Sequence, residues 1–206
     1  MNLQDLTIKD FLAKTAGSDP VPGGGSVSAL CGTLAAALAE MVTGLTIGRK
    51  KYADVQAEME AIAPRMAAAR DKFLDYIDKD AQAYDAVFSA FKMPKDTDEQ
   101  REARAAAIET TTLYAATVPL AVAALAVEIM PDIAEIADKG NKNAITDACV
   151  AMMTARTAAL GAILNVRINI AGLSNADDAS RLAGECDRLQ ALATERESAL
   201  LSSVKL

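Results

Sequence analysis

Apolar residues along this chain recur at intervals of three and four over long stretches, which is the periodicity of packed α-helices. Clusters of Gly, Pro, Ser and Asn separate these stretches and mark the expected helix ends. We predict helices over about 7–17, 26–51, 52–91, 97–130, 131–140, 143–171 and from 174 towards the C-terminus. Proline removes a backbone donor and clashes with the preceding turn, so kinks or breaks are expected at Pro64 and Pro119.

Three helix starts carry capping signals. Thr7 with Asp10, and Ser174 with Asp177, match the pattern of a capping hydroxyl followed three positions later by an acidic residue. Thr97 follows a proline-containing loop and is expected to cap the next helix.

The composition favours one all-α domain over residues 1–206. Hydrophobic residues make up 51% of the chain, yet aromatic residues make up only 4% and Trp is absent. The apolar content is therefore largely Ala, the strongest helix former. We predict a helical bundle of long, kinked, Ala-rich helices.

Three stretches are near the length of a membrane span: Val27–Ile47, Leu113–Met130 and Ala148–Ile170. They are rich in Ala, Gly and Thr rather than Leu, and each contains a charged residue. We therefore predict buried helices whose backbones approach closely, and no membrane insertion. So much apolar helix surface in a short chain also suggests that some of it is buried in an oligomer.

Charge and cysteine content exclude several classes of protein. The formal net charge is −7, and most basic residues are scattered rather than gathered on one stretch, which argues against nucleic-acid binding. The three cysteines lie far apart in sequence, as expected for a reduced cytoplasmic protein. The first ten residues lack the charged-then-apolar pattern of a signal peptide.

Histidine is absent, and this restricts the possible chemistry. Histidine is the usual general base and metal ligand at neutral pH, so a Ser-His-Asp triad and a His-based metal site are both excluded. We expect no metal centre, and acid–base work must fall to carboxylates, Tyr, Lys or Cys.

Asp80 is the most unusual residue for its position. It falls on the same helical stripe as the apolar residues between Phe73 and Phe91. Burial would raise its pKa towards the range useful for proton transfer, and Tyr84, one turn later, could donate a hydrogen bond to it. The alternative is a carboxylate at the edge of the stripe, either solvated or paired with Lys.

The predicted 143–171 helix contains further polar residues in apolar surroundings. Asp147 could complement the helix dipole or serve a site. Asn165 and Asn169 form a pair one turn apart that could join helices or bind a ligand. Asp147 and Asn165 share a helix face but lie ~27 Å apart at ~1.5 Å per residue. Either an elongated ligand spans them, or they serve different sites or subunits, or the helix bends near Gly161.

Two further segments are candidates for ligand binding. Pro22-Gly23-Gly24-Gly25-Ser26 precedes a helix, so its backbone N–H groups could bind an anion, although it is not a P-loop because no Lys follows and no strand precedes it. The alternative is a flexible tight turn. Arg49-Lys50-Lys51 could bind a carboxylate-rich tail, or could simply complement the end of the predicted 26–51 helix.

Several motifs resemble, in order, those of one family. They are Pro22–Ser26, Leu45–Tyr52, Asp78–Tyr84, Met93-Pro94-Lys95, Val118-Pro119-Leu120, Gly140–Asn143 with Thr146-Asp147, and Asn165–Asn169. Together they cover nearly the whole chain and are similar to the C-terminal domain of the formiminotransferase-cyclodeaminase family and to stand-alone methenyltetrahydrofolate cyclohydrolases. Two mild departures are Thr146, where Ser is common, and Tyr84, where Phe also occurs, so the Tyr84 hydroxyl is not expected to be essential.

The resemblance implies an all-helical homodimer that binds reduced folate, including polyglutamylated forms, without a metal or nucleotide cofactor. It implies that Asp80 is the catalytic acid–base. The residues expected to bind the folate are Gly23, Gly24, Gly25, Ser26, Arg49, Lys50, Tyr84, Asn143, Asp147, Asn165 and Asn169.

The family carries out two reactions at the bridge between N5 and N10 of tetrahydrofolate. Cyclohydrolases add water to methenyltetrahydrofolate and give 10-formyltetrahydrofolate, whereas cyclodeaminases convert formiminotetrahydrofolate to methenyltetrahydrofolate and ammonia. A carboxylic acid with a raised pKa can move the protons that both reactions need. Cyclohydrolase is slightly favoured because no transferase domain is attached and Ile47–Tyr52 resembles that subgroup. A non-catalytic folate-binding or helical interaction module is the alternative.

Overall fold

The computed structural model describes residues 2–205, and every regular element in that range is a helix. The elements are η1 (Leu3–Asp5), α1 (Ile8–Thr15), α2 (Gly24–Thr46), η2 (Lys50–Val55), α3 (Gln56–Phe91), α4 (Asp98–Lys139), η3 (Lys142–Ala144), α5 (Ile145–Ile170) and α6 (Ala176–Ser203). The all-α prediction is confirmed.

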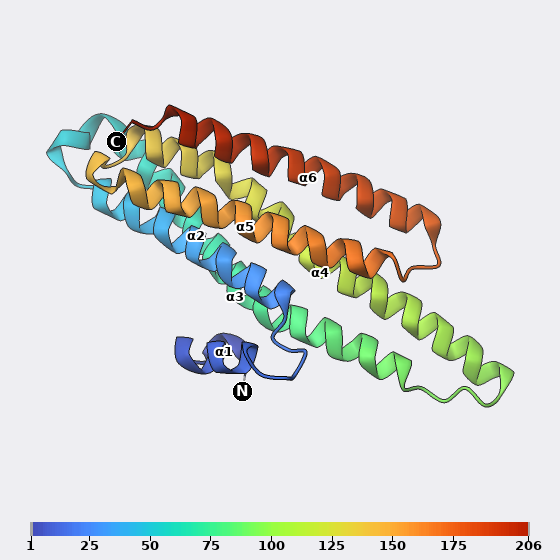
Figure 1. Ribbon diagram of the computed structural model, residues 1–206. Helices are drawn as coiled ribbons and strands as arrows, with labels where there is room; N and C mark the ends of the chain where they lie inside the picture. The colour runs from blue at the N-terminus through green and yellow to red at the C-terminus, as the bar shows by residue number, and fades with distance from the viewer. Residues whose placement is uncertain (1, 206) are drawn as a thin grey trace.

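The helices α2 to α6 lie side by side in an elongated bundle (Figure 1). At one end the α3–α4 hairpin extends past the other helices, and at the opposite end α2 leads into η2 (Figure 1). The N-terminal segment is fastened to α3 by a hydrogen bond of 2.6 Å from the Leu3 N–H to Asp78 Oδ1. Asp78 is buried, and this bond satisfies only one of its oxygens, since Oδ2 has no hydrogen-bond partner among the described residues.

Small side chains form much of the core and let the helix axes approach closely. On α2 and α5 the fully buried residues are mostly alanines, among them Ala35, Ala39, Ala155 and Ala159. Larger side chains fill the spaces between α2 and α3, where the ring of Phe73 lies against the backbone of Gly32. A Cβ at Gly32 would lie 2.5 Å from that ring, so the contact requires glycine.

We expect Gly32→Ala to destabilise the protein by about 1–3 kcal/mol, because an added methyl group overpacks a core contact. Chemical denaturation measures the free energy of unfolding directly. Gly44→Ala is the matched control on the same helix, because a Cβ there meets nothing within 4 Å. Alanine should be neutral or stabilising at that position, by up to ~1 kcal/mol. Equal effects of the two substitutions would contradict this account of the α2–α3 contact.

Two predicted helix ends are wrong at the corner between α2 and α3. We predicted one helix over residues 26–51, but α2 ends at Thr46. Gly48 has a φ of 76°, a left-handed conformation that interrupts the helix. Arg49, Lys50 and Lys51 therefore lie in and beside η2 rather than in the last turn of α2, and the next helix begins at Gln56.

The prolines interrupt neither α3 nor α4, and the prediction of a new helix at Pro131 is wrong. Helix α3 continues through Pro64, and α4 runs without a break through Pro119 and Pro131, so the separate helix predicted over 131–140 does not exist. A proline leaves the carbonyl four residues earlier without its helical donor. In α4 both of these carbonyls find another donor. Asn169 Nδ2 donates to Ala115 O at 2.8 Å, and Arg196 Nη1 donates to Val127 O at 2.6 Å.

The capping predictions are partly confirmed. Thr7 accepts a hydrogen bond from the Asp10 N–H, and Thr97 forms a capping box with Gln100. At the start of α6 the cap is Asn175 rather than Ser174, since the Asn175 side chain accepts from the first backbone N–H groups of that helix. Ser and Asn are both favoured N-cap residues, so the sequence alone could not decide between the adjacent Ser174 and Asn175.

By length and composition alone, the described chain has three helices apolar enough to cross a membrane, namely α2, α4 and the segment Lys142–Ile170 that contains α5. In the bundle these helices bury 50%, 61% and 44% of their most apolar windows. Part of the apolar surface of α2 and α5 therefore stays exposed.

Candidate active site

A cavity of about 340 Å³ opens where the N-terminus of α2 meets α3, α4 and α5. Its walls come from four helices and from the segment before α2. The lining residues are Pro20, Val21, Gly23, Gly24, Gly25, Asp80, Ala83, Tyr84, Val87, Ala115, Asn165, Ile168 and Asn169. This cavity therefore brings together residues that the sequence suggested separately, namely the glycine segment, Asp80, Tyr84, Asn165 and Asn169.

Asp80 lies directly against the N-terminus of α2. The Ser26 hydroxyl donates to Asp80 Oδ2 at 2.9 Å, and the Ser26 backbone N–H also donates to this carboxylate. A Cβ at Gly25 would lie 2.0 Å from Asp80 Oδ1, so only glycine allows this approach. The sequence offered the Tyr84 hydroxyl as a possible donor to Asp80, but the hydroxyl that donates belongs to Ser26.

Burial raises the pKa of Asp80 above its ordinary value of 3.8, and the hydrogen bonds from the Ser26 hydroxyl and N–H oppose this in part. Desolvation disfavours the charged carboxylate more than the helix N-terminus and the hydroxyl favour it. A carboxyl group in this state can both give and take a proton nearer to neutral pH. Asp80 is therefore partly buried, as part of the wall of a cavity and not inside a continuous apolar stripe.

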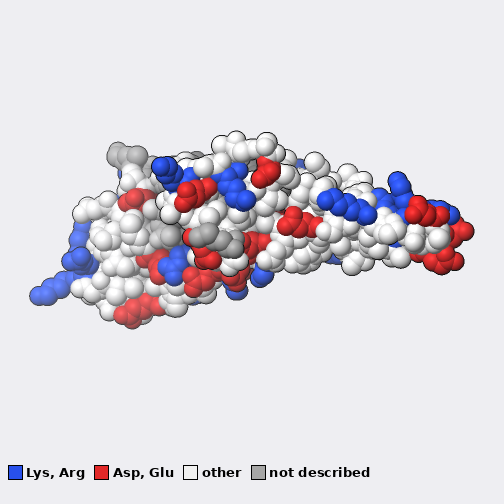
Figure 2. All heavy atoms as spheres, turned by 90° about the horizontal axis from the view of Figure 1, so that it is seen from below, with Lys and Arg blue, Asp and Glu red and all other residues white. Residues whose placement is uncertain are grey.

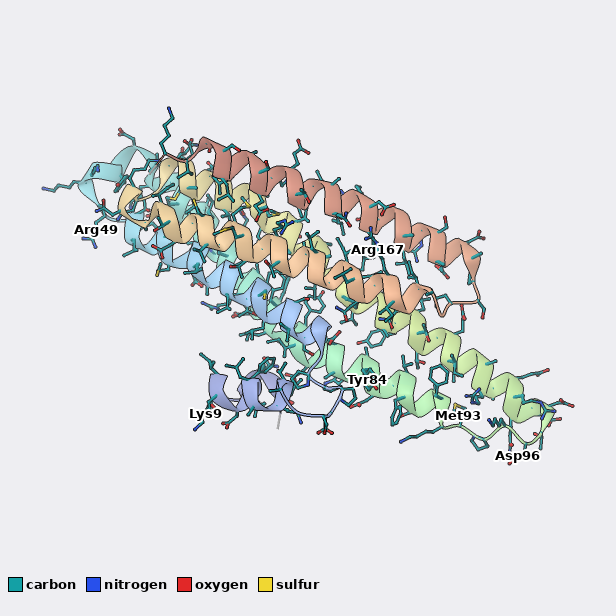
Figure 3. The ribbon with its side chains drawn as sticks, viewed as in Figure 1. Lys9, Arg49, Tyr84, Met93, Asp96 and Arg167 are labelled. Atoms are coloured by element: carbon teal, nitrogen blue, oxygen red, sulfur yellow. The ribbon has the colours of Figure 1, made fainter. Side chains whose placement is uncertain are left out.

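The rest of that predicted stripe is only half buried. Phe73 and Ile77 are 0% and 2% exposed, whereas Tyr84 and Phe91 are 42% and 53% exposed. The change occurs because α3 leaves the bundle beyond Asp80 to form the projecting hairpin with α4 (Figure 3). The sequence pattern could not reveal where the neighbouring helices stop.

The raised pKa makes stability depend on pH in a defined direction. A carboxyl whose folded pKa lies above its unfolded value stabilises the fold in its protonated form, and this contribution is lost as pH rises through the folded pKa. We therefore expect Asp80→Asn, which stays uncharged, to gain Tm relative to the unchanged protein as pH rises from about 4 to about 8. Thermal unfolding of the two proteins across that range measures the difference. If the difference in Tm between the two proteins did not change with pH, the raised pKa of Asp80 in the folded state would be contradicted.

Asn165 and Asn169 use their amide donors within the protein. Asn165 Nδ2 donates to Gly161 O at 2.8 Å, and Asn169 Nδ2 donates to Ala115 O, the carbonyl that Pro119 leaves without a helical donor. Among the described residues no donor reaches the Oδ1 atom of either side chain. The Asn169 amide therefore joins α5 to α4, while the Asn165 amide bonds within α5. Both side chains also line the cavity, so their binding of a ligand stays a prediction.

The other predicted site residues lie at the opposite end of the bundle. Arg49 and Lys50 are exposed beside η2, Asn143 is exposed in η3, and Asp147 is half-buried in the first turn of α5. Figure 3 shows Arg49 at this end and Tyr84 near the start of the projecting hairpin. Within one chain the predicted site residues therefore form two groups, as expected from the ~27 Å that separates Asp147 from Asn165 along α5.

Hydrogen bonds join the two loops at this opposite end. The Tyr52 hydroxyl accepts from the Lys142 N–H at 3.0 Å and donates to Asn141 Oδ1 at 3.3 Å. Asn141 also bonds Thr46 and Leu45 at the end of α2. The corner that carries Arg49 and Lys50 is thus held in a defined position against the start of α5.

Sequence reasoning missed the apolar wall of the cavity. Ala83 and Val87 lie on the same face of α3 as Asp80, and Ile168 lies beside Asn165 on α5. Their spacing of three and four residues from predicted site residues was an available signal. Ala115 could not be predicted from such spacing, because it reaches the cavity only through the packing of α4 against α5.

A larger hollow of about 620 Å³ lies at the other end, between α4, α5 and the C-terminal part of α6. Its carboxylate, Asp138, is exposed, and no glycine segment faces it. Among residues 2–205 no group of three or more Cys, Asp or Glu side chains is arranged to hold a metal ion. The cavity at Asp80 is therefore the better candidate for acid–base chemistry.

The fold and this cavity define a class of protein: an all-helical protein with a half-buried carboxyl of raised pKa at a helix N-terminus. The chain belongs to the formiminotransferase-cyclodeaminase family, whose profile matches residues 7–188. The family resemblance predicted from the sequence is thereby confirmed.

Individual relatives support the same family. The chain is 40% identical over 200 residues to a methenyltetrahydrofolate cyclohydrolase of Methylorubrum extorquens, covering 97% of this chain and 96% of that protein. It is 34% identical over 174 residues to the formimidoyltransferase-cyclodeaminase of Mus musculus, covering 84% of this chain but only 32% of that protein. The crystal structure of a formiminotetrahydrofolate cyclodeaminase from Thermotoga maritima matches with a TM-score of 0.87 and 28% identity, covering 98% of this chain and 96% of that one.

Proposed function

We propose that this protein is a folate enzyme that acts on the one-carbon bridge between N5 and N10 of tetrahydrofolate, with Asp80 as its acid–base. One observation carries the proposal. A half-buried carboxyl with a raised pKa lies against the N-terminus of α2, in the wall of a cavity of about 340 Å³. The names of the relatives supply the substrate class, since they are a methenyltetrahydrofolate cyclohydrolase and formiminotetrahydrofolate cyclodeaminases.

The proposed chemistry needs one group that takes and returns a proton. In the cyclohydrolase reaction a water molecule adds to the methenyl carbon and gives up a proton to Asp80. Asp80 then protonates N5 as the bond between that carbon and N5 breaks. In the cyclodeaminase reaction N10 attacks the carbon of the protonated formimino group and gives up its proton to Asp80. Asp80 returns that proton to the amino group, which leaves as ammonia as its bond to the carbon breaks and the methenyl group forms. General acid–base catalysis of this kind contributes typically about 10²–10⁴-fold to a rate.

The cavity wall offers suitable groups for a reduced pterin. The ring system carries N–H donors, and the Oδ1 atoms of Asn165 and Asn169 are acceptors at the wall. Tyr84, Val87 and Ile168 supply apolar surface for the flat ring. The Tyr84 hydroxyl has no assigned part in the reaction, so its ring is the feature that we expect to matter.

Between the two reactions we favour methenyltetrahydrofolate cyclohydrolase. The cyclohydrolase relative matches over nearly its whole length at 40% identity, whereas the chain spans about a third of the formimidoyltransferase-cyclodeaminases. The Thermotoga maritima structure is a cyclodeaminase of similar length to this chain, so cyclodeaminase remains the second candidate.

The absorbance of methenyltetrahydrofolate distinguishes these candidates. Protein-dependent loss of added methenyltetrahydrofolate would assign cyclohydrolase activity. Protein-dependent formation of it from formiminotetrahydrofolate would assign cyclodeaminase activity. The Asp80→Asn protein in parallel separates catalysis at this site from a contaminating activity. No turnover of either substrate would overturn the proposal in favour of a non-catalytic folate-binding or interaction module.

We further propose that the protein works in the cytoplasm as a homodimer, outside the membrane and without nucleic acid, metal or nucleotide cofactor. The acidic net charge of −7 and the absence of histidine support the last three points. The substrate is expected to be polyglutamylated folate as well as the monoglutamate. The exposed apolar surface of α2 and α5 supports the dimer.

A further inference from the structure

Ser26 places its side-chain hydroxyl between two acceptors on α3. Its Oγ atom lies 2.9 Å from Asp80 Oδ2 and 3.1 Å from the backbone carbonyl oxygen of Ile77. Both distances are short enough for a hydrogen bond. A serine hydroxyl carries one proton, so it donates fully to one of these acceptors at a time. The carboxyl of Asp80 and the carbonyl of Ile77 therefore compete for the same proton.

Burial leaves the Ser26 hydroxyl no partner outside the protein. The residue is 0% exposed, so bulk solvent does not reach it. A buried hydroxyl that donates to nothing costs free energy, so its proton points to one of the two acceptors. The Ile77 carbonyl can accept this proton in addition to its helical hydrogen bond, because a carbonyl oxygen has two lone pairs.

Ser26 contacts the carboxyl from the side that faces away from the cavity. Asp80 forms part of the cavity wall, whereas Ser26 is not one of the residues that line it. The backbone of Ser26 is fixed in the first turn of α2. Its hydroxyl thus acts on Asp80 and does not touch a ligand in the cavity.

Few other ionisable groups face Asp80. Among the described residues that line its cavity, Tyr84 is the other one that can titrate, and the walls from α2, α4 and α5 carry no charge. The adjoining hollow contains Lys14, Asp19 and Asp85. Basic side chains gather at the η2 end of the molecule (Figure 2), at the other end of α2 from Ser26. Burial raises the pKa of Asp80, and the interactions that oppose this are the two hydrogen bonds from Ser26.

We propose that Ser26 is a positioning residue whose hydroxyl turns from Ile77 O to Asp80 Oδ2 when Asp80 loses its proton, and turns back when Asp80 regains it. A charged acceptor makes the stronger hydrogen bond, so the ionised carboxylate draws the hydroxyl away from the carbonyl. The protonated carboxyl is a weaker acceptor, and the carbonyl then competes with it. The hydroxyl only rotates about its C–O bond, so Ser26 neither gains nor loses a proton.

This exchange suits a carboxyl that must take and return a proton, and in that respect the inference rests on the proposed function. A donor that could bond only to the carboxylate would lose its acceptor as Asp80 became protonated, and this cost would oppose the first proton transfer. With Ile77 O as the alternative acceptor, the hydroxyl keeps a partner in both states. Ser26 thus stabilises the ionised carboxylate without penalising the protonated acid.

Ser26→Ala should raise the pH at which Asp80 titrates by about 1 pH unit, because a hydrogen bond to a charged group is worth more than one to a neutral group. Carbon NMR of protein labelled with ¹³C at the aspartate carboxyl groups measures this midpoint without turnover. The signal of Asp80 is identified by its absence from the Asp80→Asn protein. A midpoint that Ser26→Ala leaves unchanged would overturn the proposal.

Ser28→Ala is the matched control for this titration. Ser28 lies on the same helix, is 5% exposed, and donates to Gly24 O at 2.7 Å rather than to Asp80. The control thus loses a buried hydroxyl without losing a bond to the carboxylate, and the midpoint should not move. An equal rise in both variants would show that loosening of α2 moves the midpoint, and would also overturn the proposal.

The same shift should appear in the pH dependence of catalysis. Both proposed reactions begin with proton transfer to Asp80, so kcat/KM falls at pH values where Asp80 is protonated in the free enzyme. In Ser26→Ala this acidic limb should lie about 1 pH unit higher, so that kcat/KM is ~10-fold lower on the limb and less affected above it. A uniform loss at every pH would assign Ser26 a merely structural role and contradict the proposal.

Thermal unfolding tests the exchange between the two acceptors. Removing the donor moves the folded pKa of Asp80 further above its unfolded value, so more stability is lost as pH rises through it. The loss of Tm caused by Ser26→Ala should therefore grow from about pH 4 to about pH 8, and in the Asp80→Asn background it should stay constant. A loss independent of pH in both backgrounds would mean that the hydroxyl stays on Ile77 O, against the proposal.

The proposed function fails on a different result. Full turnover by the Asp80→Asn protein would remove Asp80 from the reaction, whereas the NMR midpoint and the comparison of Tm values report on Ser26 without any substrate. A midpoint that rises in Ser26→Ala, stays fixed in Ser28→Ala and matches the displaced acidic limb is the result that we expect.

Discussion

Asp80→Asn should lower kcat by about 10²–10⁴-fold while the folate still binds. Asn has the same shape as Asp and can accept the same hydrogen bonds from Ser26, so the cavity keeps its form. It cannot take a proton from water or return one to nitrogen, so the tetrahedral intermediate neither forms nor collapses efficiently. Steady-state kinetics with methenyltetrahydrofolate and a binding titration with the same folate measure the two effects separately.

The control for this substitution is Asp75→Asn. Asp75 lies on the same helix and is exposed, outside the cavity. It should change kcat by less than ~2-fold, since general acid–base catalysis requires a group within hydrogen-bond reach of the reacting atoms. Full activity of the Asp80→Asn protein would remove Asp80 from the mechanism, and loss of folate binding together with activity would assign it to binding instead.

Gly25→Ala should lower kcat/KM by ~10²-fold or more, because displacement of a catalytic group by about 1 Å can cost that much. A Cβ at this position would lie 2.0 Å from Asp80 Oδ1, and the backbone of α2 holds it there. The carboxylate must therefore move away from the N–H groups of α2. Steady-state kinetics measure the loss, and circular dichroism shows whether the helices remain folded.

Gly24→Ala is the matched control for the glycine segment. Its Cβ would lie 3.2 Å from Asn165 Nδ2, a contact that a shift of a few tenths of an ångström in a side chain can relieve. We expect a smaller loss than for Gly25→Ala. If both alanines were equally harmful, the glycines would matter for the turn itself and not for the approach of Asp80.

The helices and the main catalytic candidate could be predicted from the sequence because both depend on local pattern. Ala-rich helices follow from composition and periodicity. Asp80 was identified because a carboxylate on an apolar helix face is unusual, whatever it packs against. Its partner could not be identified in this way. Ser26 lies 54 positions earlier in the chain and reaches Asp80 only through the packing of α2 on α3.

The wrong helix boundary at Pro131 has a similar cause. A proline penalises a helix by leaving one carbonyl without a donor, and the local sequence shows only this cost. In α4 the compensating donors, Asn169 and Arg196, come from α5 and α6. The penalty is thus offset by tertiary contacts, and the helix continues. Asn169 shows that a polar residue in an apolar helix can have a structural role, because its side chain supplies the donor that Ala115 O lacks.

Some of the predicted folate-binding residues lie far from Asp80. The resemblance grouped Arg49, Lys50, Asn143 and Asp147 with Asp80, yet the chain places them at opposite ends of the bundle. This separation depends on the length of α5 and on the packing of the helices around it.

The central claim is that the Asp80 cavity is where the one-carbon bridge of the folate reacts. A crystal structure of the Asp80→Asn protein with methenyltetrahydrofolate tests it most directly, because this variant should bind the folate and turn it over slowly. The account predicts the bridge carbon within hydrogen-bonding reach of the substituted side chain at position 80, with the pterin against Asn165 and Asn169. A folate bound instead in the hollow between α4 and α6, with the Asp80 cavity empty, would contradict it.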